Sequence, residues 1–228
     1  KQNEKYLFCM WWDGYSQAPE LVKTCIDSLR NIGNYKMIVL DKNNVFEYIT
    51  LSDEIIGKFE QKKITITHLS DIIRVNLLAN YDCIWVDATV FVSKPVNALT
   101  QYSIFSLREE ETDAYVSRNR WTGFFMSSNG MQPIFMDAAM FFNIYWRKYD
   151  ILVDYYLLDY VYEVMYRNVE TFRESIDILP KQKNIYALSD ALEETTNVNV
   201  LKEVMQMHPI SKLTWKIQYK VKLSDLLK

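Results

Sequence analysis

Three short apolar runs in the first ninety residues constrain the fold more than any other feature of this sequence. They are Tyr6–Trp12, Lys36–Leu40 and Cys83–Val86. A continuous apolar run is typical of a strand that is covered on both faces. Segments with helical spacing of apolar residues separate them, namely residues 19–29, 52–61 and 68–80. This alternation predicts an α/β fold, with a mostly parallel central sheet flanked by helices.

The second half of the chain is less regular. Two further strands are predicted at Ser103–Leu107 and Trp121–Met126, separated by a solvated charged loop at Arg108–Asp113 and followed by a turn at Ser127–Gly130. Two long aromatic-rich helices are then predicted at Pro133–Tyr149 and Ile151–Asn168. Since no low-complexity linker or internal repeat interrupts the 228 residues, we expect a single domain, residues 1–228.

Composition excludes several classes of function. A formal charge of −3 and a pI near 5.5 give no basic surface for nucleic acid, so no nucleic-acid partner is expected. Three cysteines without metal-ligand spacing favour a reducing compartment, and hence a cytoplasmic location. No stretch approaches the roughly 18 apolar residues of a transmembrane segment. Oligomeric state stays open.

The segment Thr67–Val90, which contains the third helix pattern and the third strand, contains the candidate site. Thr67 is predicted to cap the helix His68–Asn80, on which Asp71 and Arg74 share a face. The strand Cys83–Val86 then ends in Asp87, and ligands bind at the carboxyl ends of strands in open α/β sheets. A surface ion pair and a turn aspartate are the simpler interpretations of these residues.

The same residues carry a resemblance to a known family. Ser70-Asp71-Ile72-Ile73-Arg74 followed by Asp87-Ala88-Thr89 resembles the S-D-x-x-R and D-x-D signature of GT-A glycosyltransferases. Trp11-Trp12-Asp13-Gly14 near the start and Ser211–Lys216 near the end are similar to stretches of the capsular polysaccharide synthesis proteins, which are related to them. The resemblance covers nearly the whole chain and implies a GT-A-like, Rossmann-type fold.

The resemblance also implies an activity and a set of site residues. It implies transfer of a sugar from a nucleotide-diphosphate sugar, usually with Mn or Mg, to a hydroxyl of a growing capsular polysaccharide or other glycan, with retention of anomeric configuration. The residues expected to bind this donor are Trp11, Asp71, Arg74, Asp87, Thr89, Lys212 and Trp215. Residues 1–100 would form the nucleotide-sugar half, and residues 101–228 the acceptor half with a C-terminal closing segment.

Two departures from the family pattern bear on the chemistry. Thr89 stands where the second Asp of D-x-D is expected, and a hydroxyl is a poor ligand for hard cations, so any metal would depend on Asp87 and His208. Tyr81-Asp82-Cys83 replaces the usual glycine pair. For catalysis, Asp87 and Asp159 are the candidate carboxylates, and Arg74 and Lys212 would stabilise the departing diphosphate.

Three hypotheses follow from the sequence. The first is a bacterial glycosyltransferase whose acceptor is a glycan or lipid-linked glycan, which would bring the protein to the inner membrane face as a peripheral protein. The second is a non-catalytic relative that binds sugar nucleotides. The third is a structural α/β protein in which Asp71, Arg74 and Asp87 form an internal ion-pair network.

Overall fold

The computed structural model describes residues 4–96 and 98–227; residues 1–3, 97 and 228 of the predicted domain lie outside this part. Its strands are β1 Tyr6–Met10, β2 Lys36–Leu40, β3 Cys83–Val86, β4 Val90–Val92, β5 Ile104–Ser106, β6 Phe125–Ser128 and β7 Ile210–Lys212. Its α-helices are α1 Glu20–Ser28, α2 Asp53–Glu60, α3 Ile66–Asn80, α4 Pro133–Lys148, α5 Leu157–Asn168, α6 Glu170–Asp177, α7 Ala187–Glu194, α8 Val198–Met207 and α9 Leu223–Leu226. Short 3-10 helices are η1 Tyr15–Gln17, η2 Leu29–Asn31, η3 Val45–Glu47 and η4 Ala98–Gln101.

The central sheet has the strand order β2-β1-β3-β6-β5. β1 pairs in parallel with both β2 and β3, in a register that places Tyr6 opposite Lys36 and Cys83. β6 is antiparallel to β3, and β5 is antiparallel to β6, so β5 runs in the same direction as β3. Four of the five strands therefore share one direction, which confirms the predicted α/β class with a mostly parallel sheet.

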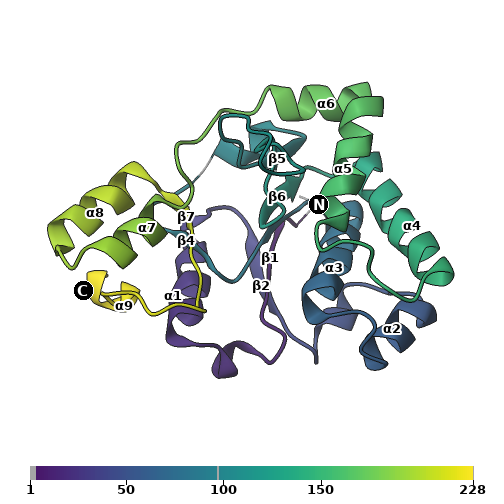
Figure 1. Cartoon of the computed structure of the whole chain (residues 1–228), viewed down its shortest axis with the longest axis horizontal. Helices are drawn as coiled ribbons and strands as arrows, with labels where there is room; N and C mark the ends of the chain where they lie inside the picture. The colour runs from purple at the N-terminus through teal and green to yellow at the C-terminus, as the bar shows by residue number, and fades with distance from the viewer. Residues whose placement is uncertain (1–3, 97, 228) are drawn as a thin grey trace.

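The described helices lie on both sides of the sheet (Figure 1). α2, α3, α4 and α5 lie on one side in this view, and α7, α8 and α9 lie on the other, close to α1. Most buried apolar residues belong to one large cluster around the sheet, while a second cluster joins α7, α8 and α9 to α1 and β4. Among the described residues, no helix is both long and apolar enough to cross a bilayer.

A second, two-stranded sheet brings the end of the chain to the candidate site. β4 follows β3 after the turn Asp87–Thr89, and β7 pairs antiparallel with β4, with Val90 opposite Lys212. The Leu213 amide also donates to the Thr89 carbonyl at 2.9 Å. Backbone hydrogen bonds therefore fix Lys212 beside the carboxyl end of β3.

The predicted cap of α3 is wrong by two residues. The helix begins at Ile66, and the side chain of Thr65, not that of Thr67, accepts a hydrogen bond from the His68 amide at 3.2 Å. Both threonines suit a cap chemically, but only Thr65 places its oxygen one turn before His68. Thr67 is an exposed residue within the first turn.

Two predictions for residues 103–130 also need correction. Arg108, assigned to a solvated loop, is buried, and its Nη1 donates to the carbonyls of Ile176 and Asp177 at 3.2 and 2.8 Å. Ser127 and Ser128, assigned to a turn, are the buried last residues of β6. The backbone pairing of β6 with β3 and β5 outweighs the turn preference of serine, because buried peptide groups need partners.

Helix α5 is shorter than predicted. It begins at Leu157, not at Ile151, so residues 151–156 form an irregular connection of bends and a turn after α4. Asp154 explains part of this difference, because its Oδ1 accepts from the Tyr156 amide at 2.7 Å, a local bond that competes with helix formation. The predicted helix Pro133–Tyr149 is confirmed as α4.

Candidate functional site

The candidate site is centred on Asp87, directly after β3. Its Oδ1 accepts hydrogen bonds from Arg74 Nη2 at 3.1 Å and from Trp85 Nε1 at 2.8 Å, and its Oδ2 accepts from Lys212 Nζ at 2.9 Å. The Asp87 side chain nevertheless keeps 27% of its area exposed, against 8% for Arg74 and 19% for Lys212. One carboxylate thus holds two cations at the edge of solvent.

Three different elements supply these side chains. Arg74 comes from α3, Asp87 and Trp85 from the end of β3, and Lys212 from β7. Trp85 and Asp87 are two residues apart, so the strand places both on the same face. The turn after Asp87 is closed by a hydrogen bond from the Val90 amide to the Asp87 carbonyl at 3.0 Å. The carboxylate is therefore held in position on both sides.

Asp71 extends the cluster along α3. Its Oδ1 lies 3.1 Å from Arg74 Nη1, and its Oδ2 lies 3.7 Å from Nδ1 of the buried His68. The His68 Nε2 accepts from Trp146 Nε1 at 3.1 Å, and an indole N–H can only donate, so the ring carries its proton on Nδ1, toward Asp71. Arg74 therefore lies between two carboxylates.

The segment before β6 forms a wall of the site. A Cβ on Gly123 would lie 2.6 Å from Arg74 Nη1, so any other residue here would force the guanidinium to shift from its present position. The neighbouring Phe124 accepts from the Asp87 amide through its carbonyl at 2.9 Å and presents its ring 4.7 Å from Lys212 Nζ. The position of Gly123 within the predicted strand Trp121–Met126 was the sequence signal for the close approach of Arg74 to this segment.

The charges of the cluster determine its protonation. Burial alone would raise the pKa of Asp87, but the charges of Lys212 and Arg74, with hydrogen bonds from Trp85 and Lys212, hold that pKa well below its usual range. Burial would lower the pKa of Arg74, yet the charges of Asp87 and Asp71 raise it. At neutral pH, Asp87 is an anion and Arg74 a cation.

Asp159 lies on α5 in a different environment. Its Oδ1 accepts from Trp121 Nε1 at 2.9 Å. Burial raises the pKa of Asp159, and the nearby negative charge of Asp71 adds to this effect. The hydroxyl of Tyr162, on the same helix, is buried without a hydrogen-bond partner among the described residues. Asp159 is thus a carboxyl that retains its proton more readily than Asp87.

The remaining donor-site predictions lie around this centre. Trp11, directly after β1, meets the exposed ring of Trp215 edge-to-face at 5.8 Å between centroids. Thr89 is half-buried in the turn between β3 and β4. The structure therefore brings Asp71, Arg74, Asp87 and Lys212 into direct contact, and it places Trp11 and Trp215 together as a separate pair.

Sequence reasoning missed two tyrosines near the centre. Tyr155 is 64% exposed, and burial of its hydroxyl together with the charge of Asp71 raises its pKa. Tyr186 is 45% exposed and packs edge-to-face on Phe124 at 6.5 Å between centroids. The charge of Asp87 contributes to the raised pKa of both tyrosines. Tyr155 falls within the stretch predicted as the helix Ile151–Asn168, and Tyr186 directly precedes α7, so no local pattern marks either as a site residue.

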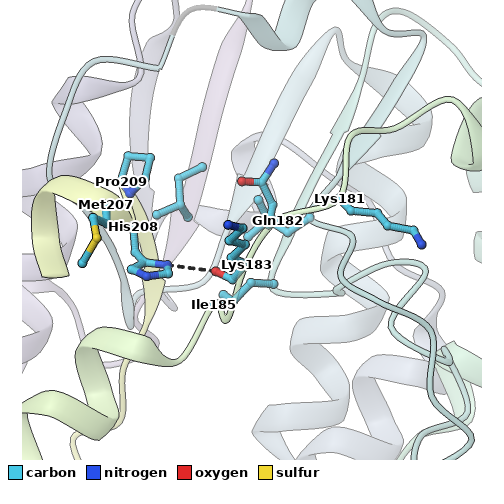
Figure 2. Close-up of a pocket in the computed structure, with 9 residues that line it drawn as sticks. Lys181, Gln182, Lys183, Ile185, Met207, His208 and Pro209 are labelled. Carbon is cyan, nitrogen blue, oxygen red and sulfur yellow. Dashed lines mark hydrogen bonds between the residues drawn. The ribbon is translucent and has the colours of Figure 1, made fainter.

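His208 lies apart from the Asp87 cluster. Its Nδ1 is 2.9 Å from the Lys183 carbonyl, and its ring lines a cavity of about 210 Å³ (Figure 2). The other residues that line this cavity are Leu107, Lys181, Gln182, Lys183, Ile185, Met207, Pro209 and Ile210. Asp87 is not among them, so the predicted pairing of Asp87 with His208 is not formed in the structure.

The donor atoms around Asp87 are a poor fit for Mn²⁺ or Mg²⁺. Both carboxylate oxygens already accept hydrogen bonds, and the Lys212 ammonium lies 2.9 Å from Oδ2, where its positive charge opposes a second cation. In the part of the chain that the structure describes, no three His, Cys, Asp or Glu side chains gather as metal ligands. Hard cations favour several charged oxygen ligands.

Fold and site together define an α/β protein with a charged cluster at the carboxyl end of a central strand. The family model of the capsular polysaccharide synthesis proteins matches residues 1–227, so the chain belongs to that family. No curated protein matches the sequence. Among solved structures, one match is the apo form of the glycosyltransferase GlyE from Streptococcus pneumoniae TIGR4, with 14% identity and a TM-score of 0.42. The match covers 98% of this chain and 59% of that one, and similarity at this level carries no information about activity.

Proposed function

We propose that the protein is a glycosyltransferase that moves a sugar from a nucleotide-diphosphate sugar to a hydroxyl of a capsular polysaccharide or related surface glycan. The observation that carries this proposal is the position of Asp87, held between Arg74 and Lys212 at the carboxyl end of β3. Ligands bind at this edge of open α/β sheets. Membership of the capsular polysaccharide synthesis family supports the choice of substrate class.

The signs of the charged side chains indicate how the sugar nucleotide would lie in the site. Guanidinium and ammonium groups bind phosphate oxygens, so Arg74 and Lys212 would face the diphosphate. Asp71 and Asp87 hold these two cations and would accept hydrogen bonds from sugar hydroxyls. Trp11 and Trp215 offer ring faces beside the site on which a nucleotide base can stack.

In the proposed reaction, the bond between the anomeric carbon and the diphosphate oxygen breaks, and the nucleoside diphosphate leaves with the electron pair. The acceptor hydroxyl forms the new bond to carbon and gives its proton to the oxygen of the departing diphosphate. Asp159 is proposed as the carboxyl near this centre, and Tyr155 and Tyr186 as the surface that receives a glycan or lipid-linked glycan. We further propose retention of the anomeric configuration.

Titration calorimetry with UDP- and GDP-sugars, followed by a transfer assay, tests this proposal. We expect one donor to bind and to lose its sugar to a glycan acceptor. Asp87→Ala should abolish binding, because it leaves Arg74 and Lys212 without their shared carboxylate. Asp137→Ala, an exposed position on α4, is the matched control and should bind normally. Absence of binding to every donor at millimolar concentration would contradict the proposal.

A second candidate function has an observation in its favour. Each of Asp71, Arg74, Asp87 and Lys212 has an ion-pair partner within the cluster, as expected of an internal network that only stabilises the fold. A non-catalytic relative would bind the donor without transferring its sugar, and a structural protein would not bind it. In the structural case, Asp87→Ala would lower stability and change nothing else.

A further inference from the structure

We propose that the Lys212 ammonium takes the place of the divalent cation in this site, so that the protein binds a nucleoside diphosphate without metal. This inference rests on the glycosyltransferase function proposed above and concerns how that function is performed. It is carried by the contact between Lys212 Nζ and Asp87 Oδ2 at 2.9 Å, together with Thr89 at the position where a second carboxylate would be needed.

The Lys212 ammonium occupies the position beside Asp87 that a metal ion would need. Asp87 Oδ1 is engaged by Arg74 and Trp85, so Oδ2 is the oxygen that a metal could share, and Lys212 is bonded to it. A divalent cation at Oδ2 would have to displace this ammonium or lie against its charge. Thr89 supplies no carboxylate, and no three His, Cys, Asp or Glu side chains of the described residues gather as metal ligands.

The lysine is held in place by the backbone and does not depend on a flexible side chain alone. Its amide donates to the Ile185 carbonyl at 2.9 Å, and the next amide, that of Leu213, donates to the Thr89 carbonyl at 2.9 Å. β7 also pairs with β4 across Val90 and Lys212. The same turn that carries Asp87 therefore positions the ammonium.

The ammonium also retains capacity for a ligand. A lysine has three N–H donors, and in the described part of the chain Lys212 Nζ makes one hydrogen bond, to Asp87, and a contact with the Phe124 ring. Lys212 and Asp87 keep 19% and 27% of their side-chain area exposed. Two donors of Lys212, with the adjacent guanidinium of Arg74, can meet diphosphate oxygens from this open side.

Calorimetric titration of the intact protein with UDP, GDP, ADP and dTDP tests the inference, first with EDTA and then with excess Mn²⁺. We expect one nucleotide to bind in EDTA, with an affinity that Mn²⁺ changes by less than about threefold. Lys212→Ala should weaken this binding by about 10- to 100-fold, the usual effect of a charge-assisted hydrogen bond. Lys202→Ala, an exposed lysine on α8, should have no effect, and Lys212→Arg should retain part of the affinity.

The outcomes separate this inference from the function on which it rests. Binding that requires Mn²⁺, or unchanged binding by Lys212→Ala, would overturn the inference and leave the glycosyltransferase proposal in place. Absence of binding in both buffers would overturn both. If Lys212→Ala does not fold, as thermal unfolding would reveal, the comparison of EDTA with Mn²⁺ on the unaltered protein still decides the question.

Discussion

Asp87 and Asp159 lie in one region of the molecule, yet their surroundings give them opposite properties. Asp87 accepts hydrogen bonds from two cations, which lower its pKa although burial raises it. Burial raises the pKa of Asp159, which accepts a hydrogen bond from a neutral indole; the charge of Asp71 adds to this effect and that of Arg74 opposes it. Neighbouring charges thus decide which carboxyl stays ionised.

This difference predicts opposite effects of removing each charge. Asp87→Asn should destabilise the protein by about 3–5 kcal/mol at neutral pH, because it leaves Lys212 without its carboxylate and the buried Arg74 with that of Asp71 alone. Asp159→Asn should cost little or stabilise by about 1 kcal/mol or less, since it removes a buried charge and keeps the bond from Trp121. Urea unfolding of both variants at pH 7 measures these effects.

The pH dependence of the stability difference between Asp87→Asn and the unaltered protein is the control for this prediction. Because the folded pKa of Asp87 is below its ordinary value of 3.8, the stability that it contributes is present above pH 3.8 and is lost as pH falls toward the folded value. The deficit of Asp87→Asn should therefore shrink below about pH 3. A deficit that stays constant as the pH falls below about 3 would contradict the charge pairing.

The spacing in the sequence indicated Asp71, Arg74 and Asp87, and the family resemblance indicated Lys212, but neither predicted the contact between Lys212 and Asp87. Helical spacing and the end of an apolar strand indicate these three residues without any tertiary information. The hydrogen bond from Trp85 to Asp87 could also have been predicted, because residues two apart share a strand face. The positions of Tyr155 and Tyr186 near the site could not have been predicted, because loops from distant parts of the chain bring them there.

At the scale of elements, the packing of the segment before β6 against α3 determines where the guanidinium of Arg74 lies. Gly123 is the residue of that segment that makes room for it. The sequence predicted α3 and β3 well, because both have clear periodicity. It did not predict the short β6 correctly, since its end, Ser127 and Ser128, consists of residues typical of turns, and pairing with β3 and β5 decides their conformation.

Gly123→Ala should therefore disrupt the site more than the fold. The new Cβ would lie 2.6 Å from Arg74 Nη1, so the guanidinium must move away from Asp71 and Asp87. We expect nucleotide affinity to fall by about tenfold or more, the loss of one charge-assisted bond. Calorimetric titration with the nucleotide that the unaltered protein binds measures this change.

Gly57→Ala is the matched control. Gly57 lies inside α2, and a Cβ there meets nothing within 4 Å. Alanine should stabilise this helix by about 0.5–1 kcal/mol and leave nucleotide affinity unchanged. Equal affinity losses in both glycine variants would mean that Gly123 acts through general stability and not through Arg74.

At the scale of the whole molecule, the second apolar cluster attaches the C-terminal helices to the first helix of the chain. Cys25 of α1 is buried in this cluster with Leu223 and Leu226 of α9. This long-range contact explains why the sequence beyond Pro180 gave little information, because its short amphipathic helices bury their apolar faces against one another, α1 and β4. The same contact protects the Cys25 thiol.

Thiol reactivity therefore reports on the docking of these helices. Cys9, Cys25 and Cys83 are all buried, and burial raises the pKa of each, that of Cys25 to about 12, so the folded protein should react slowly with a thiol reagent such as DTNB. Replacing both Leu223 and Leu226 by alanine should make one thiol reactive, Cys25, because α9 no longer covers α1. Mass spectrometry identifies the labelled residue. Labelling of Cys9 or Cys83 at the same rate would show that the whole sheet opens together with the C-terminal helices.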